Sequence, residues 1–274
     1  MRRSNRIGAI LLLAILPLTV IAPGAWAVSP GRIVPGLMLR ATDPVGASTN
    51  WGGYAVTGST GSITLVTASW VVPAVTCPST GNTFASFWVG IDGFSSSTVE
   101  QTGTDSDCRG GAAQYYAWYE FFPAGSVTIR SMSVTPGDPM VAAVWFTSGQ
   151  FTTGIKDVRT GQTFTTSATV PAALRNSAEF IVEAPLVCGL LTGCNVAALS
   201  NFNTVGFGKG NTGVALTCGL VMNGVPGSIT GFPSSDINYI AMVSQSTPVV
   251  LKATPSAPTS GGSSFQVAWA SAGP

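Results

Sequence analysis

The sequence predicts an all-β protein, built as an antiparallel sandwich or barrel with almost no helix. Valine, threonine and serine are abundant, and 33 glycines and 18 prolines among 274 residues supply frequent turns. This composition favours strands and turns over helices. Short runs of β-branched and aromatic residues also follow one another at close spacing with turn residues between them, which is typical of sandwiches and barrels.

The expected strands begin after residue 50 and continue almost to the end of the chain. Pro73 and Pro123 end two of them, and residues 254–264 are expected to form a hairpin loop. No repeat, long helix or domain boundary is evident after residue 49, so residues 49–274 are expected to form one domain. The expected strands are Ser62–Val72, Phe84–Ile91, Ser97–Thr104, Gln114–Phe122, Ser126–Val134, Met140–Thr147, Thr152–Asp157, Gln162–Val170, Ala178–Ala184, Asn203–Phe207, Val214–Val221, Tyr239–Ser244, Val249–Ala253 and Phe265–Trp269.

The N-terminus reads as a secretory signal peptide over residues 1–27. Three arginines within the first six residues precede an apolar run, and Ala25-Trp26-Ala27 supplies a small-x-small cleavage signal. The alternative is an uncleaved membrane anchor, but the run is shorter than the ~20 residues that span a bilayer. Residues 28–48 are rich in proline and glycine and are expected to form a linker or a short pro-segment. We therefore expect a secreted protein, cleaved near Ala27.

Export would place the five cysteines in an oxidising environment, where disulfides form. We favour the pairs Cys77–Cys108 and Cys188–Cys194, which leaves Cys218 without a partner. Spacing alone does not fix this connectivity. No C-x2-C spacing is present, so we expect no metal bound by these cysteines.

Charged residues are scarce, and this scarcity excludes several mechanisms. Only 8% of residues are charged, against about 25% in an average soluble protein, and there is no histidine. The chain therefore lacks a Ser-His-Asp triad, a Cys-His pair and His-ligated zinc. Removing residues 1–27 takes three of the twelve basic residues and none of the eleven acids, leaving a net charge of −2. So few basic residues predict no nucleic-acid partner.

Three acids lie inside apolar strands, whereas most of the eleven lie in turn-like settings. Glu120 follows Ala-Trp-Tyr, and Glu179 and Glu183 flank Phe-Ile-Val. Side chains alternate along a strand, so Glu179 and Glu183 share a face but lie about 13 Å apart. That distance is too long for a glycosidase carboxylate pair, although a pair from two different strands stays open. Gln101 and Asp105 likewise share one face, and Glu100 points the other way.

Five segments give the chain a family resemblance when they are taken together and in order. They are Asn50-Trp51-Gly52-Gly53, Trp88-Val89-Gly90-Ile91-Asp92-Gly93, Gln101-Thr102-Gly103-Thr104-Asp105, Ala117-Trp118-Tyr119-Glu120 and Ala178-Glu179-Phe180-Ile181-Val182-Glu183. With this order and spacing, the stretch from about residue 50 to 269 resembles the eqolisins, the glutamic peptidases.

The resemblance implies a lectin- or glucanase-like sandwich of two large antiparallel sheets and an endopeptidase that works at acid pH without a cofactor. It assigns catalysis to Gln101 and Glu179. It places Trp51, Trp88, Tyr119 and Glu120 in the substrate cleft, with Asp92 and Asp105 supporting the pair. Glu179, near its ordinary pKa of ~4.3, would act as base and then acid at about pH 3–5, while the Gln101 amide stabilises the oxyanion.

Three departures from the family pattern leave this pair untouched. Phe180 replaces a common tryptophan, Tyr116 stands where an aspartate is frequent, and Ala184-Pro185 replaces an acidic-aromatic pair. Subsite preference and pH optimum are therefore not carried over. The expected partners are protein or peptide substrates, with no stable membrane association, and a monomer is expected.

Two other functions stay open at this point. A carbohydrate-binding or carbohydrate-hydrolysing sandwich would share the fold class, but it would need closely spaced acids on one strand, and none is evident. A non-catalytic secreted adhesion or coat domain would suit the low charge. The low charge also predicts tolerance of acid, because few carboxylates stand to be protonated.

Overall fold

The computed structural model describes residues 32–34, 47–189 and 193–273. The predicted signal peptide and most of the predicted segment 28–48 lie outside these residues. Within the described parts, no helix is long and apolar enough to cross a membrane. The helical elements there are α1 (Lys209–Thr212) and two single 3-10 turns, Ile229–Gly231 and Ser234–Asp236.

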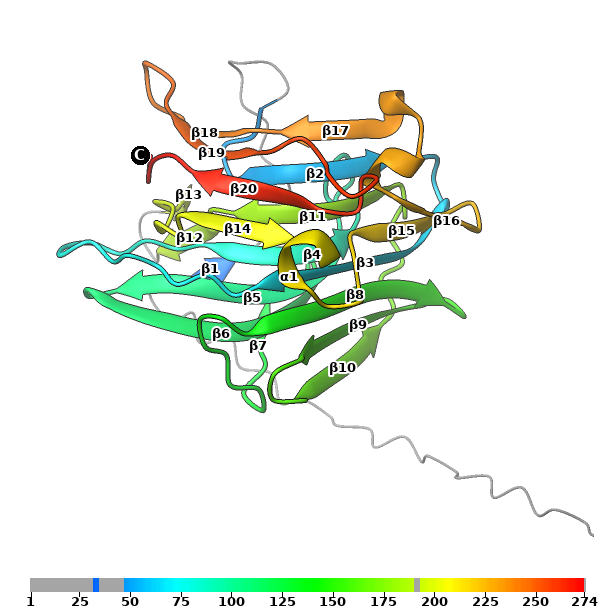
Figure 1. Ribbon diagram of the computed structural model, residues 1–274, viewed down its shortest axis with the longest axis horizontal. Helices are drawn as coiled ribbons and strands as arrows, with labels where there is room; N and C mark the ends of the chain where they lie inside the picture. Colours follow the sequence, from blue (N-terminus) through cyan, green and yellow to red (C-terminus); the bar gives the residue numbers. More distant parts are fainter. Residues whose placement is uncertain (1–31, 35–46, 190–192, 274) are drawn as a thin grey trace, which may run out of the picture.

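Two large antiparallel sheets form a sandwich, and the strand axes of the two sheets are nearly aligned in Figure 1. This arrangement confirms the predicted fold class. The seven-stranded sheet contains, in spatial order, β17 (Ile237–Ile240), β2 (Trp51–Thr57), β11 (Ser177–Glu183), β4 (Ser86–Ile91), β5 (Val99–Arg109), β6 (Ala112–Phe122) and β7 (Val127–Thr128).

The second large sheet has ten strands and carries the short helix α1 against β14 and β3. Its main path is β10 (Thr163–Ala168), β9 (Gln150–Asp157), β8 (Pro139–Thr147), β3 (Ile63–Val71), β14 (Thr204–Phe207), β20 (Phe265–Trp269), β19 (Leu251–Pro255) and β18 (Met242–Val243). Beside this path, β15 (Gly219–Met222) pairs with β3 and with β16 (Val225–Ser228).

A third, small sheet contains β1 (Arg32–Val34), β12 (Leu186–Gly189) and β13 (Gly193–Val196). Its strands β12 and β13 follow directly after β11 in the chain.

Tight turns set the register of the long hairpins. Gly110 and Gly111, with φ of 57° and 80°, join β5 to β6, and Ser148 and Gly149, with φ of 51° and 81°, join β8 to β9. Consecutive positive φ angles suit the right-handed twist of the flanking strands, and glycine adopts them without strain. The turn at 110–111 therefore fixes which side chains of β5 and β6 share a face.

The main hydrophobic core lies between the two large sheets. One face of the seven-stranded sheet contributes Phe87, Val89, Phe180 and Val182, and Trp70 of β3 reaches across to donate a hydrogen bond to Thr104 Oγ1 (2.9 Å). Because strand side chains alternate, the other set of residues on the same strands lies on the outer face. That outer face carries its own buried cluster, centred on Trp51, Trp88 and Trp118.

Most expected strands are present, with shifted ends, and the differences have local causes. The run Ser126–Val134 is a strand only over Val127–Thr128, and β1, β2, β12, β13 and β16 were not expected. Glycines hide β2 in the sequence. A Cβ at Gly53 would collide with the carbonyl oxygen of Phe180, so close contact with β11 requires glycine there.

The disulfides confirm the favoured pairing. Cys77 and Cys108 are bonded, as are Cys188 and Cys194, and Cys218 is buried without a disulfide partner.

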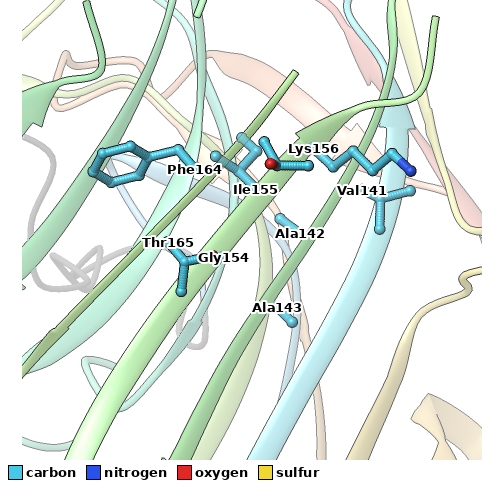
Figure 2. A pocket seen from close by; sticks show the side chains of 9 residues that line it. Val141, Ala142, Ala143, Gly154, Ile155, Lys156, Phe164 and Thr165 are labelled. Atoms are coloured by element: carbon cyan, nitrogen blue, oxygen red, sulfur yellow. The ribbon is translucent and has the colours of Figure 1, made fainter. Parts of the chain in front are cut away.

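A shallow depression of about 200 Å³ lies on β8, β9 and β10, and Figure 2 shows it from close by. Its lining includes Ala143, Gly154, Lys156 and Thr165, and none of the predicted site residues. It belongs to the ten-stranded sheet and is therefore no part of the candidate active site.

Candidate active site

The outer face of the seven-stranded sheet carries a row of polar side chains that spans four strands. The register pairs Glu179 with Gly90, Gly90 with Gln101, and Gln101 with Glu120. Glu179 and Gln101 are therefore two strands apart, about 10 Å between Cα atoms, with only a glycine between them. Because Gly90 has no side chain, the carboxyl and amide groups can approach each other over it.

Space above Gly90 is already limited. A Cβ at this position would lie 3.0 Å from Trp88 Cζ3, 3.1 Å from Gln101 Cβ and 3.2 Å from the Glu100 carbonyl oxygen. These distances are tighter than most real Cβ contacts. Glycine is thus the residue that leaves room for Gln101 to turn toward Glu179.

Trp88 and Trp118 lie in the next row of the same sheet face. Each indole N–H donates a hydrogen bond to a carboxylate in the row after that, which fixes both rings. Trp88 Nε1 donates to Glu183 Oε2 (2.9 Å), and Trp118 Nε1 donates to Asp105 Oδ1 (2.6 Å). Gly103 lies between the two tryptophans in the register. Asn50 Nδ2 also donates to Glu183 Oε1 (3.2 Å). The acids thus hold two indole rings in place beside the Glu179–Gly90–Gln101 row.

Glu179 is fully buried, and its pKa is raised well above the ordinary value of 4.5. Burial is the main cause, because it penalises the charged form, and the charges of Asp92 and Glu100 raise the pKa further. The nearby Ser177 hydroxyl and the backbone of Phe94 lower this pKa, but by less than burial raises it. Neither carboxyl oxygen accepts a well-aligned hydrogen bond from a described residue. The expectation that Glu179 keeps a pKa of ~4.3 is therefore wrong for this buried carboxyl.

Glu120 holds the Gln101 amide in one orientation. Gln101 Nε2 donates to Glu120 Oε2 (2.7 Å), while Gln101 Oε1 is buried and has no hydrogen-bond partner among the described residues. One N–H of Gln101 is thereby used, and the other N–H and the carbonyl oxygen stay available. Glu120, expected to contact substrate, contacts Gln101 in this structure.

A second acidic group lies further along β5. Tyr116 donates its hydroxyl hydrogen to Asp107 Oδ2 (2.8 Å), and Arg109 Nη2 lies 3.6 Å from the same oxygen. Burial raises the pKa of Asp105 to about 6, more than its hydrogen bond from Trp118 lowers it. Tyr116 stands where the family often has an aspartate. This chain therefore has a hydroxyl, bound to Asp107, in place of that carboxylate.

The remaining predicted residues have different settings. Trp51 packs edge-on against Trp88, with ring centroids 4.9 Å apart, on the expected face. Asp92 lies beyond the end of β4, where its carboxylate accepts backbone N–H hydrogen bonds from Arg175 (2.7 Å) and Asn176 (2.9 Å). Asp92 therefore anchors the turn that leads into β11 and Glu179.

Tyr119 lies on the opposite face from the other predicted residues. It packs against the core between the sheets, and its ring stacks on Phe164 with centroids 5.4 Å apart. Alternation explains this, since Tyr119 is adjacent to Glu120 and must point the other way. The structure therefore separates Tyr119 from the predicted cleft.

Sequence reasoning gave no site role to Trp118, Asp107 or Asn50. The period-two alternation contained the signal for the first two, because Asp107 continues the series from Gln101 and Asp105, and Trp118 lies two residues before Glu120. Asn50 precedes β2, and only the tertiary contact with Glu183 reveals its place.

Comparisons with known proteins place the chain in a family. The Peptidase A4 family matches residues 49–219. Aspergillopepsin-2 from Aspergillus niger is 30% identical over 201 residues, which cover 65% of this chain and 69% of that protein. Scytalidopepsin B from Scytalidium lignicola is 35% identical over 141 residues, 49% of this chain and 51% of that protein.

Solved structures show the same fold. A crystal structure of scytalido-glutamic peptidase with a peptide-based transition state analog has a TM-score of 0.66 and 24% identity, covering 81% of this chain and 98% of that one. Aspergilloglutamic peptidase from Aspergillus niger has a TM-score of 0.55 and 23% identity, covering 69% and 99%. The chain belongs to the peptidase A4 family and is a glutamic endopeptidase of that family, acting on protein or peptide substrates.

Proposed function

We propose that Glu179 and Gln101 are the catalytic pair of this endopeptidase. The observation that supports this most strongly is the single row Glu179–Gly90–Gln101 on one sheet face, in which a glycine separates the two side chains. The row brings one titratable group and one amide together. A carboxyl can transfer protons, and an amide offers fixed donors and an acceptor.

In the proposed mechanism, ionised Glu179 takes a proton from a water molecule as that water attacks the scissile carbonyl. The free N–H of Gln101 donates to the developing oxyanion, and Gln101 Oε1 accepts a hydrogen bond from the attacking water. Protonated Glu179 then gives its proton to the leaving amine. Glu120 acts as a positioning residue, because its hydrogen bond prevents the Gln101 amide from rotating.

The raised pKa of Glu179 adjusts the expected pH dependence. A carboxylate with a raised pKa is a stronger base, but its ionised form is populated only at higher pH. The rising limb of kcat/KM with pH is therefore expected above pH 4.5, rather than within pH 3–5.

The test is hydrolysis of a denatured protein and a fluorogenic peptide between pH 2 and pH 7. The wild type is expected to cleave both, and Gln101→Ala is expected to lose about 10²–10³-fold in kcat, as for loss of one oxyanion donor. Full activity in Gln101→Ala would contradict the assignment. A wild type that cleaves no protein but binds glycans would favour the carbohydrate alternative instead.

We also propose that the protein is exported and works as a monomer. The arginine-rich start, the apolar run and Ala25-Trp26-Ala27 support export, and two disulfides suit an oxidising compartment. N-terminal sequencing of the protein recovered outside the cell is expected to give a first residue after Ala27. Recovery only from the membrane fraction, with Met1 retained, would contradict export and support the anchor alternative.

A further inference from the structure

The small sheet β1–β12–β13 joins a piece of the N-terminal region to the chain just after the candidate site. β12 begins three residues after Glu183, and β1 pairs with it in antiparallel register: Arg32 with Cys188, Ile33 with Val187 and Val34 with Leu186. Figure 1 shows β1 beside the β12–β13 hairpin. Apart from β1, the described residues form no strand on this side of β12.

Hydrogen bonds connect the base of the β12–β13 hairpin to residues beside the candidate site. Ala197 N donates to Pro185 O (2.9 Å), and Ala184 N donates to Asn50 O (2.8 Å). The buried Lys252 donates from Nζ to Ala197 O (3.2 Å). Since Asn50 in turn binds Glu183, the position of β12 relative to the catalytic row is well defined.

The disulfide shows which backbone groups of β12 face β1. Cys188 and Cys194 are directly opposite each other, and their Cα atoms are only 3.9 Å apart. So short a separation marks a non-hydrogen-bonded pair of an antiparallel ladder, where hydrogen-bonded pairs are about 5.5 Å apart. The N–H and C=O of Cys188, and by alternation those of Leu186, therefore point away from β13. In this structure they point at Arg32 and Val34.

We propose that this edge of β12 binds the extended backbone of the peptide substrate, with β1 occupying the edge as an intramolecular substitute. The inference rests on the proposed function, because it names how that substrate is held. Strand addition recognises a peptide through main-chain hydrogen bonds. Leu186 is seven residues from Glu179, at most about 23 Å along the chain, so a peptide on this edge would lie up to about seven residues from the catalytic row.

Three features of the described residues support a peptide as the occupant. The edge offers unpaired main-chain donors and acceptors whenever β1 leaves, which is the property that attracts another strand. The side chains of Leu186, Val187 and Cys188 are half-buried rather than enclosed, so side chains of varied size fit beside them. The occupant now present, β1, is only three residues long and thus a weak competitor.

The first test changes β1 in the full chain by proline substitution. Val34→Pro removes an N–H that faces β12, whereas Ile33→Pro removes one that faces away and serves as the matched control. Val34→Pro is expected to lower KM for a fluorogenic peptide about threefold to tenfold with kcat unchanged, since one hydrogen bond of the competitor is lost. Ile33→Pro is expected to match the wild type. Equal KM values in an active enzyme would overturn the proposal.

The second test measures binding without cleavage, by amide hydrogen exchange of Leu186 and Cys188 in the Glu179→Gln, Val34→Pro chain. The probe is acetyl-Gly-Arg-Ile-Val-Pro-amide, which copies residues 31–35. We expect this peptide and its form N-methylated at isoleucine to slow the exchange, and the form N-methylated at valine to have no effect. Protection that ignores the methylation pattern would overturn the strand-addition site.

The two tests separate this inference from the proposed function. If the wild type cleaves no peptide but exchange follows the methylation pattern, the catalytic assignment fails and the β12 edge stands as a peptide-binding site. Suppose instead that the enzyme cleaves peptides, that Val34→Pro and Ile33→Pro have the same KM, and that protection from exchange ignores the methylation pattern. The catalytic assignment then stands and the β12 edge is rejected.

Discussion

Glu179→Gln is expected to lower kcat by about 10²–10⁴-fold, while the chain stays folded. The amide has nearly the same size as the carboxyl but can neither take a proton from water nor give one to the leaving amine. Because burial raises the pKa of Glu179, the native protein holds this side chain uncharged over much of the acid range. The neutral amide therefore fits without a new buried charge, so stability should change little.

Glu100→Gln is the matched control for this substitution. Glu100 is also buried in the seven-stranded sheet, one residue from Gln101, but its side chain lies on the opposite face. We expect the kcat of Glu100→Gln at pH 4–5 to stay within about threefold of the wild type. Kinetics and circular dichroism of both variants provide the measurement. Loss of activity in Glu100→Gln but not in Glu179→Gln would reverse the assignment.

The free energy of unfolding is expected to fall steeply as pH rises from 5 to 8. Burial, strengthened by the charge of Asp92, raises the pKa of Glu100 from 4.5 to about 9. The folded chain then keeps a proton on Glu100 over a range where the unfolded chain has lost it. Stability therefore decreases with rising pH between these two pKa values, by about 1.4 kcal/mol per pH unit, or about 4 kcal/mol from pH 5 to 8.

Other buried acids act in the same direction. Burial raises the pKa of Asp105 to about 6 and also raises the pKa values of Asp92, Asp107 and Glu179. Burial lowers the pKa of Lys252 from 10.5 to about 8. The contribution of Lys252 to stability therefore increases with pH, but only above about pH 8. Whole domains are stable by only about 5–15 kcal/mol, so these acids are enough to make the protein weakest at neutral to alkaline pH.

Urea unfolding of the wild type and Glu100→Gln at pH 5 and pH 8 tests this expectation. The wild type should lose several kcal/mol between the two pH values, and Glu100→Gln should lose about 4 kcal/mol less, because the amide does not titrate. A wild-type stability that stays level or rises from pH 5 to pH 8 would contradict it. The low charge predicted tolerance of acid; the buried carboxyls add an expected intolerance of neutral pH.

Alternation along single strands could be predicted well from sequence. Gln101 and Asp105 do share a face, and Glu100 does point the other way. The same rule places Tyr119 opposite Glu120, and there the family resemblance, which put both in the cleft, disagreed with local geometry. The pairing Cys77–Cys108 was also favoured from sequence, although spacing alone could not fix it.

The sequence could not predict how deeply each acid or glycine is buried. Glu179 and Glu100 are both glutamates within expected strands, yet packing alone decides how far each pKa rises. Gly53 similarly made β2 look like a loop, because the reason for the glycine is the Phe180 carbonyl of a strand more than a hundred residues away.

The sequence by itself determined the all-β class, the faces of the strands and the residue types available for chemistry, because these depend on neighbours within a few positions. The tertiary structure alone decided that Glu179, Gly90 and Gln101 share one row, that acids hold Trp88 and Trp118, and that β1 lies on the edge of β12. Those arrangements depend on register between strands distant in sequence, which the whole packed sandwich sets and no local pattern contains.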